Sequence, residues 1–357
     1  MKIVHITNCL RGGGIQNFLL SLLPEQVKLN HDVELIVIER NTHDYSEYLT
    51  TLLRKSGVNV FFLNKERSNK MSLIRTLYLC RKRVCNKKPD IVNTHGEMSH
   101  IYGAFSTILS GIPHCITVHN APEKWDWLNT WLNVNKPIIY CSDSAYDLRV
   151  QKSKQCVIIN NGISPTIIRN KNVVDLRVEL SLTEKDKIIV SVGSLRKQKN
   201  YEFLKSIVEI LNDEHVHFCI CGGHYGSGYI DIESFKGYKN IHFLGLRSDV
   251  TAIENGSDIF LSCAVFEGLP IAVLEAYFNG IPCVLSPIIQ HKRIAQNIYA
   301  CYIPKDFTAE AFVDSIKKAF SLKENHEEIY SKRKANIHQY TVEITAKEYI
   351  DFYKKCI

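Results

Sequence analysis

The chain lacks several patterns that would assign it to a well-defined class of protein. Its twelve cysteines form no CxxC pair, and several lie inside apolar runs, so we expect buried thiols of a reducing compartment and no disulfide framework. The first apolar strand begins at residue 2, so we expect no leader, and the uncharged stretch at 101–113 is too short and too broken by Ser and Gly to span a bilayer. We therefore expect a cytoplasmic protein.

The sequence also lacks the patterns of elongated and nucleic-acid-binding proteins. We find no internal repeat, low-complexity tract or heptad run, which excludes solenoids and coiled coils. No nucleic-acid-binding motif occurs, and the aromatic residues are not interleaved with basic ones, so we expect no nucleic acid as a partner. What remains is a globular composition, 45% hydrophobic and 23% charged, in 357 residues, a length that suits two domains.

The excess of positive charge is confined to the first half of the chain. Residues 1–165 hold 20 Lys and Arg against 13 Asp and Glu, whereas the remainder holds 24 against 24. Much of the excess lies at 65–88, where apolar residues such as Met71 and Ile74 alternate with lysines and arginines. A basic amphipathic helix of this kind could lie on an anionic membrane, or it could be an ordinary solvated helix packed on a sheet.

Apolar runs typical of strands alternate with helical segments along the chain. In the first half we expect strands at 2–8, 33–39, 58–63, 90–95, 115–120, 138–142 and 157–163. After a polar stretch, we expect strands at 188–193, 216–221, 241–245, 258–262, 282–286 and 299–303. This alternation predicts an α/β protein with parallel sheets, whose ligands bind at the carboxyl ends of the strands.

Two features of the first half are candidates for ligand contacts. The first strand runs into Gly12-Gly13-Gly14 and then into a helix, which is how nucleotide-binding α/β units begin, although the spacing is not the GxGxxG of dinucleotide sites. His95 and His119 stand at the ends of expected strands. A lone histidine is more often structural than functional, so both interpretations are open for each.

The most distinctive stretch is residues 266–280. Pro270 suits the first position of a helix and Gly280 the position after its end, and the segment between them is apolar on nearly all faces. Its one charge, Glu275, needs either a cation of the protein or ligand hydroxyls if it is buried. Glu267 lies in the preceding loop, whose backbone N–H groups could bind phosphate. Alternatively, Glu267 is a solvated loop residue and Glu275 lies at a surface.

Glu267 and Glu275, with Gly268, Leu269 and Pro270 after the first, resemble the signature of retaining glycosyltransferases of family 4, which have the GT-B fold. Four other segments resemble the family in the expected order, namely the glycine loop, the strand end at His119, the turn at Asn161-Gly162 and the basic loop with Lys199. The resemblance implies two Rossmann-like α/β/α domains that face each other across a cleft. The acceptor-side domain would span 1–164 with a C-terminal helix at 340–357 packing back on it, and the nucleotide-sugar domain would span 165–339.

The resemblance also implies roles for individual residues. Glu267 would hold the donor sugar and stabilise an oxocarbenium-like transition state, His119 would reach the same sugar, and Glu275 would accept both ribose hydroxyls. Arg196 would replace an arginine that many members carry where this chain has Ser194. The residues that would bind the donor diphosphate are Lys199, Arg196, Gly13, Gly14, Gly268 and Leu269, and those that would hold the base through their backbone are Gly223 and Leu246.

The activity implied is retaining transfer of a hexosyl group from a nucleotide-diphosphate-sugar to a glycan. No cofactor is implied, and the chain has no DxD sequence, so we expect no metal. By family analogy the basic first domain is the acceptor side. The preferred acceptor is therefore a polyprenyl-diphosphate-linked glycan at the inner face of the cell membrane, as in the assembly of O-antigen, capsule or exopolysaccharide, with possible peripheral contact to that membrane.

Three other functions are weighed against this one. A nucleotide-sugar 2-epimerase has a related fold, but it needs carboxylates and histidines arranged for proton removal, and no such set is evident. A dinucleotide oxidoreductase needs GxGxxG, which is absent. A non-catalytic partner of an active transferase would have lost Glu267, His119 or Lys199, and the chain retains all three.

Overall fold

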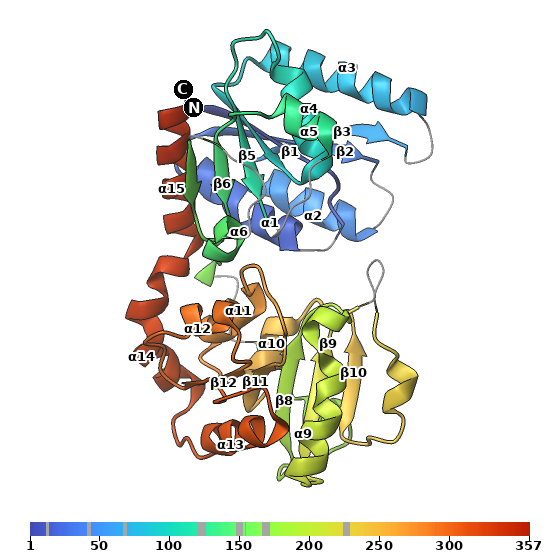
Figure 1. Ribbon diagram of the computed structural model, residues 1–357, viewed down its shortest axis with the longest axis vertical. Helices are drawn as coiled ribbons and strands as arrows, with labels where there is room; N and C mark the ends of the chain where they lie inside the picture. Colours follow the sequence, from blue (N-terminus) through green and yellow to red (C-terminus); the bar gives the residue numbers. More distant parts are fainter. Residues whose placement is uncertain are drawn as a thin grey trace. The chain divides into compact units, whose positions relative to one another are not determined.

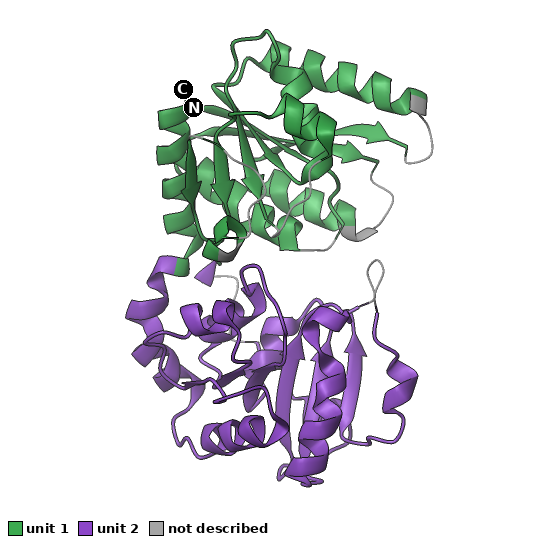
Figure 2. Ribbon diagram, viewed as in Figure 1, with its two compact units in different colours: residues 1–163, 340–357 green, residues 164–339 purple. Residues whose placement is uncertain are grey.

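The computed structural model describes residues 1–11, 14–40, 44–66, 70–119, 126–147, 153, 155–165, 172–223 and 229–357. The chain forms two compact units (Figures 1 and 2). The first consists of Met1–Ile163 and Tyr340–Ile357, and the second of Ser164–Gln339. The sequence placed this division after residue 164, and the structure divides after Ile163.

The first unit is built on a parallel sheet in the order β3-β2-β1-β4-β5-β6-β7. Its strands are β1 (Lys2–Thr7), β2 (Asp32–Glu39), β3 (Asn59–Lys65), β4 (Ile91–His95), β5 (His114–Val118), β6 (Ile138–Tyr140) and β7 (Cys156–Ile158). Most of these residues are buried, as expected when helices cover both faces of a sheet. The strand order reverses between β1 and β4, and ligands of such sheets bind outside the carboxyl ends of the strands at this point.

Helices cover both faces of the first sheet (Figure 1). They are α1 (Gly14–Lys28), α2 (Asp44–Lys55), α3 (Lys70–Lys87), α4 (Glu97–Thr107), α5 (Trp127–Leu132), α6 (Asp143–Asp147) and the C-terminal α15 (Val342–Cys356). Phe18 of α1 and Tyr349 of α15 share one core with Ile3. Cys80 of α3 packs with Val4, which faces the other side of the sheet. The last helix of the chain therefore completes the core of the first unit.

The second unit has a parallel sheet in the order β10-β9-β8-β11-β12-β13. Its strands are β8 (Lys187–Val192), β9 (Val216–Cys221), β10 (Ile241–Gly245), β11 (Ile259–Ser262), β12 (Cys283–Leu285) and β13 (Cys301–Tyr302). Its helices are α8 (Leu176–Glu179), α9 (Leu204–Leu211), α10 (Val250–Asn255), α11 (Ile271–Asn279), α12 (Ile289–Ile294), α13 (Ala309–Phe320) and α14 (His326–Ile337). It also has the short 3-10 turns η1 (Lys197–Lys199), η2 (Tyr201–Phe203), η3 (Ile232–Phe235) and η4 (His338–Tyr340). The last of these lies where the chain returns to the first unit.

Each strand expected from the sequence has a counterpart, and most ends agree within one or two residues. The exception is β7, which ends at Ile158 and not at residue 163. Beyond β7 the chain turns to meet the start of α15. Ile163 donates to the Tyr340 carbonyl at 2.8 Å and accepts from the Val342 N–H at 2.9 Å. At Gly162 a Cβ would stand 2.6 Å from the Thr341 carbonyl, so this close approach requires the glycine that the sequence assigned to a turn.

Candidate active site

The loops that follow β8 and β11 meet where the strand order of the second sheet reverses. Gln198 joins them, because its side-chain amide donates to the Phe266 carbonyl at 2.7 Å and its own carbonyl accepts from the Val265 N–H at 3.0 Å. Beside this contact the Lys199 ammonium lies 2.6 Å from the Glu267 carboxylate. Two residues that the sequence proposed separately, as a diphosphate ligand and as a catalytic group, thus form one ion pair.

The Lys199–Glu267 pair is largely shielded from solvent, with side-chain exposures of 19% and 8%. Gly193, which follows β8, makes room for the lysine, since a Cβ there would stand 2.7 Å from Lys199 Cε. The Tyr201 hydroxyl also donates to the Gly193 carbonyl at 3.1 Å. A side chain at position 193 would therefore displace the lysine. Glu267 is buried, so the interpretation of this residue as a solvated loop position was wrong.

His291 belongs to the same region, and the sequence analysis missed it. Ser286, after β12, donates to the Ala264 carbonyl at 2.5 Å, and its oxygen lies 3.0 Å from His291 Nδ1. Because the serine proton is already used, Nδ1–H of the histidine donates to this oxygen. The other ring nitrogen, Nε2, is buried with no partner among the described residues. Burial lowers the pKa of His291 to about 4, and the charge of Lys199 acts in the same direction.

α11 begins at Ile271, one residue later than expected. Pro270 is its N-cap, with φ −79° and ψ 80°, and so precedes the first helical residue. Gly280 ends the helix with φ 75°, as predicted. No side chain of the described residues caps the N-terminus. The Ile271 and Val273 N–H groups already donate to the Leu269 and Pro270 carbonyls, each at 3.0 Å, so an anion here would be bound by the other N–H groups of this turn. Gly268 and Leu269, just before the helix, are half-buried.

Glu275 is partly exposed on α11 and has no hydrogen bond or ion pair with any residue in the described ranges. Burial raises the pKa of Glu275 to about 7. The neighbouring Glu254 is fully buried, and burial together with the charge of Glu275 raises the pKa of Glu254 well above its usual value. Of the three interpretations in the sequence analysis, a protein cation is not found in this part of the chain, and binding of ligand hydroxyls and a position at the surface both stay open.

The other predicted residues of the second unit lie at the carboxyl edge of the same sheet. Gly223 and Leu246 follow β9 and β10, and Leu246 is 66% exposed. The Gly223 carbonyl already accepts from the Leu195 N–H at 3.2 Å. Arg196 is an exposed residue immediately before η1, and its backbone bridges to Tyr229. The roles of these residues stay predictions.

In the first unit the predicted glycine loop falls between β1 and α1. Gly13 lies outside the described residues. Gly14 is the exposed first residue of α1, and a Cβ there would meet no atom within 4 Å. The Gln16 side chain donates to the Cys9 carbonyl at 3.1 Å, which ties the start of α1 to the end of β1. The position of Gly14 therefore leaves open space next to the helix N-terminus.

His119 directly follows β5, and His95 ends β4. Their rings are hydrogen-bonded, with His95 Nδ1 2.9 Å from His119 Nε2. Phe18 packs edge-on against the His119 ring, with centroids 5.3 Å apart. Burial lowers the pKa of His119 to about 3 and that of His95 well below its usual value. The structure thus brings together two histidines that the sequence analysis treated separately.

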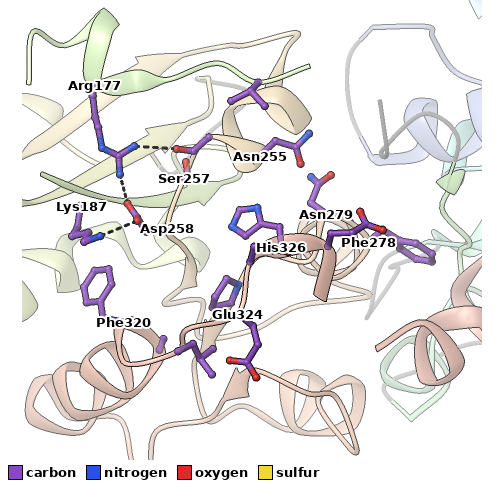
Figure 3. A pocket seen from close by; sticks show the side chains of 17 residues that line it. Arg177, Lys187, Asn255, Ser257, Asp258, Phe278, Asn279, Phe320, Glu324 and His326 are labelled. Atoms are coloured by element: carbon purple, nitrogen blue, oxygen red, sulfur yellow. Dashed lines mark hydrogen bonds and ion pairs between the residues drawn. The ribbon is translucent and has the colours of Figure 1, made fainter. Parts of the chain in front are cut away.

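A separate cavity of about 630 Å³ lies at the opposite, amino ends of the strands in the second unit (Figure 3). Lys187, Asp258 and Pro282 line it, at the starts of β8, β11 and β12. Asp258 binds Arg177 at 2.5 Å and Lys187 at 3.5 Å, so the cavity's basic groups are already paired. This cavity is therefore distinct from the site around Lys199.

Comparison with known proteins agrees with this arrangement. Residues 12–166 match the family model described as Glycosyltransferase Family 4, and residues 174–336 match the model described as Glycosyl transferases group 1. The chain belongs to glycosyltransferase family 4. This family 4 glycosyltransferase has no helix in the described ranges that is long and apolar enough to cross a bilayer.

Relatives of this family 4 glycosyltransferase include enzymes with lipid-linked acceptors in their names. It is 24% identical to the UDP-Gal:alpha-D-GlcNAc-diphosphoundecaprenol alpha-1,3-galactosyltransferase of Escherichia coli, over 88% of this chain and 87% of that protein. It is 20% identical to the N,N'-diacetylbacillosaminyl-diphospho-undecaprenol alpha-1,3-N-acetylgalactosaminyltransferase of Campylobacter jejuni, over 97% of both chains. Its structure resembles that of Anabaena Alr3699/HepE in complex with UDP and glucose, with a TM-score of 0.78 and 13% identity over 99% of this chain and 100% of that one. The fold is GT-B, as the sequence predicted.

Proposed function

We propose that this glycosyltransferase moves a hexosyl group, with retention of anomeric configuration, from a nucleotide-diphosphate-sugar to a polyprenyl-diphosphate-linked glycan. The reaction would serve surface polysaccharide assembly. The observation that carries the proposal is the buried Lys199–Glu267 pair at the reversal of the sheet, next to the uncapped end of α11. The choice of substrates is supported by the names of relatives, which include UDP-Gal, diphosphoundecaprenol-linked acceptors and capsular polysaccharide biosynthesis.

The second unit would bind the nucleotide. Glu275 would accept hydrogen bonds from both ribose hydroxyls, and hydrogen bonds to a charged group contribute about 1.5–3 kcal/mol each. Four residues separate Glu275 from the start of α11 at Ile271, which is about 6 Å along the helix axis. One helix could therefore hold the ribose through its side and the diphosphate through its N-terminus.

Lys199 and the N–H groups around Gly268 and Leu269 would stabilise the diphosphate leaving group. Negative charge grows on that group as the glycosidic bond breaks, and fixed positive dipoles and charges lower the energy of such a state. We propose that this arrangement takes the place of a metal ion. Arg196, which is exposed immediately before η1, would contribute to the same role.

Glu267 would act on the sugar. In the free protein it neutralises Lys199 at 2.6 Å. A bound diphosphate would compete for the lysine and leave the Glu267 carboxylate facing the sugar, where it could accept from hydroxyls and stabilise positive charge at the anomeric carbon. His119 of the first unit would contact the same sugar.

The acceptor would be bound by the basic first unit. Exposed apolar side chains gather on α3 and at the end of α4, here called the α3–α4 patch, namely Met71, Ile74, Tyr78, Phe105, Ile108 and Leu109. Arg81 joins the two helices by donating to the Phe105 and Ile108 carbonyls at 3.0 and 2.8 Å. Apolar residues surrounded by lysines and arginines suit the surface of an anionic bilayer, so this patch supports peripheral membrane contact.

The test is a transfer assay with nucleotide-sugars and an undecaprenyl-diphosphate-linked sugar as acceptor, with the anomeric configuration of the product read by NMR. We expect transfer with retention, and we expect it to persist in EDTA. An inverted product would contradict the retaining mechanism. Complete loss of activity in EDTA, restored by a divalent cation, would contradict the role given to Lys199 and α11.

A further inference from the structure

A chain of hydrogen-bonded imidazoles runs through the first unit to His119. His5 Nε2 lies 2.8 Å from Gln26 Oε1, and His5 Nδ1 lies 2.9 Å from His95 Nε2. His95 Nδ1 in turn lies 2.9 Å from His119 Nε2. Gln26, His5 and His95 are almost wholly buried, at 0%, 0% and 1% exposure. The chain therefore links the interior of the unit to one candidate site residue.

The register of the sheet explains why these side chains meet. His5 of β1 pairs with Asn93 of β4, and His95 pairs with Thr117 of β5. Paired residues, and residues two apart on one strand, point to the same face of a sheet. His5, His95 and His119 consequently share the face that α1 and α15 cover. Phe18 packs against the last two rings.

Counting the protons on the three histidine rings shows which way each hydrogen bond in the series runs. Burial lowers the pKa of His5 to about 4, and the other two rings are likewise neutral at neutral pH. Each neutral ring has one N–H, and three rings make three hydrogen bonds. The Gln26 oxygen can only accept, so His5 donates from Nε2. His5 Nδ1 must then accept from His95, and His95 Nδ1 must accept from His119 Nε2–H.

The Gln26 amide sets this direction at the inner end of the histidine chain. Its oxygen, Oε1, faces His5 Nε2. Its nitrogen, Nε2, is buried with no hydrogen-bond partner among the described residues. An acceptor at this end makes His5 Nε2 the donor, and the orientation of the other two rings follows from it.

We propose that Gln26, His5 and His95 are positioning residues that hold His119 as the Nε2–H tautomer, so that its Nδ1 accepts a hydrogen bond from a hydroxyl of the donor sugar. The proposal rests on the proposed function, which places His119 at that sugar. His119 Nδ1 is buried and has no partner among the residues that the structure describes. Its lone pair is therefore available to a hydroxyl donor.

The chain orients His119 and does not remove protons from the site. A proton taken up at Nδ1 could pass inward only as far as the Gln26 amide, which is not a base. His119 is therefore assigned as a hydrogen-bond acceptor and not as a general acid. These hydrogen-bonded side chains would exclude the Nδ1–H tautomer of His119. In that tautomer Nδ1 would be a donor, and the sugar hydroxyl would have to act as the acceptor.

The test is the tautomeric state of His119 in full-length protein labelled with ¹⁵N-histidine, with the signal assigned by its loss in His119→Asn. Without donor, two-bond ¹H–¹⁵N spectra should show Nε2 protonated and Nδ1 bare. In Gln26→Met, which removes the accepting oxygen at similar volume, both tautomers should appear. Turnover should then fall about fivefold to tenfold, the effect of one neutral hydrogen bond, with unchanged nucleotide affinity and a cooperative thermal transition.

His242→Gln is the matched control, because it breaks another histidine pair, His217 Nδ1 to His242 Nε2 at 3.1 Å, far along the sequence from His119. It should leave both the His119 spectrum and turnover unchanged. An Nδ1–H tautomer in the unmodified protein overturns the proposal, and so does unchanged turnover in Gln26→Met. Failure of the proposed function would instead appear as no sugar transfer by the unmodified protein. The spectrum can still be read in that case, because it is recorded without any donor.

Discussion

Glu267 and Glu275 differ in their surroundings although both flank the start of α11. Glu267 is 6% exposed and paired with Lys199, whereas Glu275 is unpaired within the described residues and its pKa is raised by burial to about 7. Two carboxylates in different environments can serve different roles. We therefore expect changes at the two positions to separate turnover from nucleotide binding.

Glu267→Gln should lower turnover by about a hundredfold or more, the typical effect of removing one group that stabilises a transition state. Affinity for the nucleoside diphosphate should stay within about threefold, because the ribose and base contacts are elsewhere; calorimetric titration measures it. Glu233→Gln is a matched control, since Glu233 also pairs with a lysine, Lys236, but on an exposed surface. A collapse of nucleotide affinity in Glu267→Gln would show that Glu267 is part of the binding site.

Glu275 should make nucleotide affinity depend on pH. The ionised carboxylate accepts from hydroxyls, so affinity should rise with pH through about 7, the raised pKa of Glu275. Glu275→Gln should bind about tenfold more weakly at pH 8 and should lack this component of the pH dependence. Comparing the two proteins cancels the titration of the nucleotide's own phosphate. Equal affinity at every pH would mean that Glu275 is structural.

The same carboxylate should affect stability with the opposite sign. Because its pKa is raised from 4.5 in the unfolded chain to about 7 in the folded protein, the folded state holds more protons between these values, and stability from this group falls as pH rises through that window. Without ligand, the Tm of Glu275→Gln should therefore rise relative to that of the unmodified protein as the pH increases from 4.5 to 7. A constant difference would contradict the raised pKa.

At the scale of elements, the alternation of apolar runs was enough to predict the strands, the α/β class and the helix before Gly280. Contacts between distant loops were not predictable in this way. Lys199 and Glu267 are 68 residues apart, and only the strand order, with β8 next to β11, brings their loops together. The histidine chain depends in the same way on the register of β1, β4 and β5, which periodicity along one strand does not reveal.

The start of α1 offers a test of ligand approach. Gly14→Ala adds a methyl group that meets no protein atom within 4 Å, and alanine favours a helix, so stability should be unchanged or slightly higher. If the donor approaches this backbone closely, as the resemblance to family 4 implies, the KM for the donor should rise severalfold. Gly237→Ala is the control, since a Cβ at Gly237 also meets nothing within 4 Å. Unchanged kinetics in Gly14→Ala would remove Gly14 from the site.

The α3–α4 patch makes a prediction about membranes. Ile74 is 63% exposed on α3, so Ile74→Glu should cost little stability but should weaken co-sedimentation with vesicles that contain phosphatidylglycerol, by about fivefold or more. Ile210→Glu, on α9 of the second unit where Ile210 is 42% exposed, should have no effect. Equal binding by both variants would show that the patch is not a membrane contact.

At the scale of the whole molecule, both units follow one plan. Each has a parallel sheet whose strand order reverses once, between β1 and β4 and between β8 and β11. In each unit most candidate residues follow the strands at this reversal or the next strand along the sheet, and Leu246, after β10, is the exception. The central claim is that the reversal in the second unit binds a nucleoside diphosphate.

Thermal unfolding of the full chain with UDP, GDP, ADP, CMP or NAD tests this claim most directly. At about a hundred times its Kd, a ligand adds roughly 2.7 kcal/mol to the free energy of unfolding, which is a clear rise in Tm. We predict such a rise with one nucleoside diphosphate, and about half of it in Glu275→Gln at the same concentration, as tenfold weaker binding implies. Three results would contradict the account. They are a rise in Tm with NAD alone, no rise with any of these ligands, and a rise of equal size in Glu275→Gln.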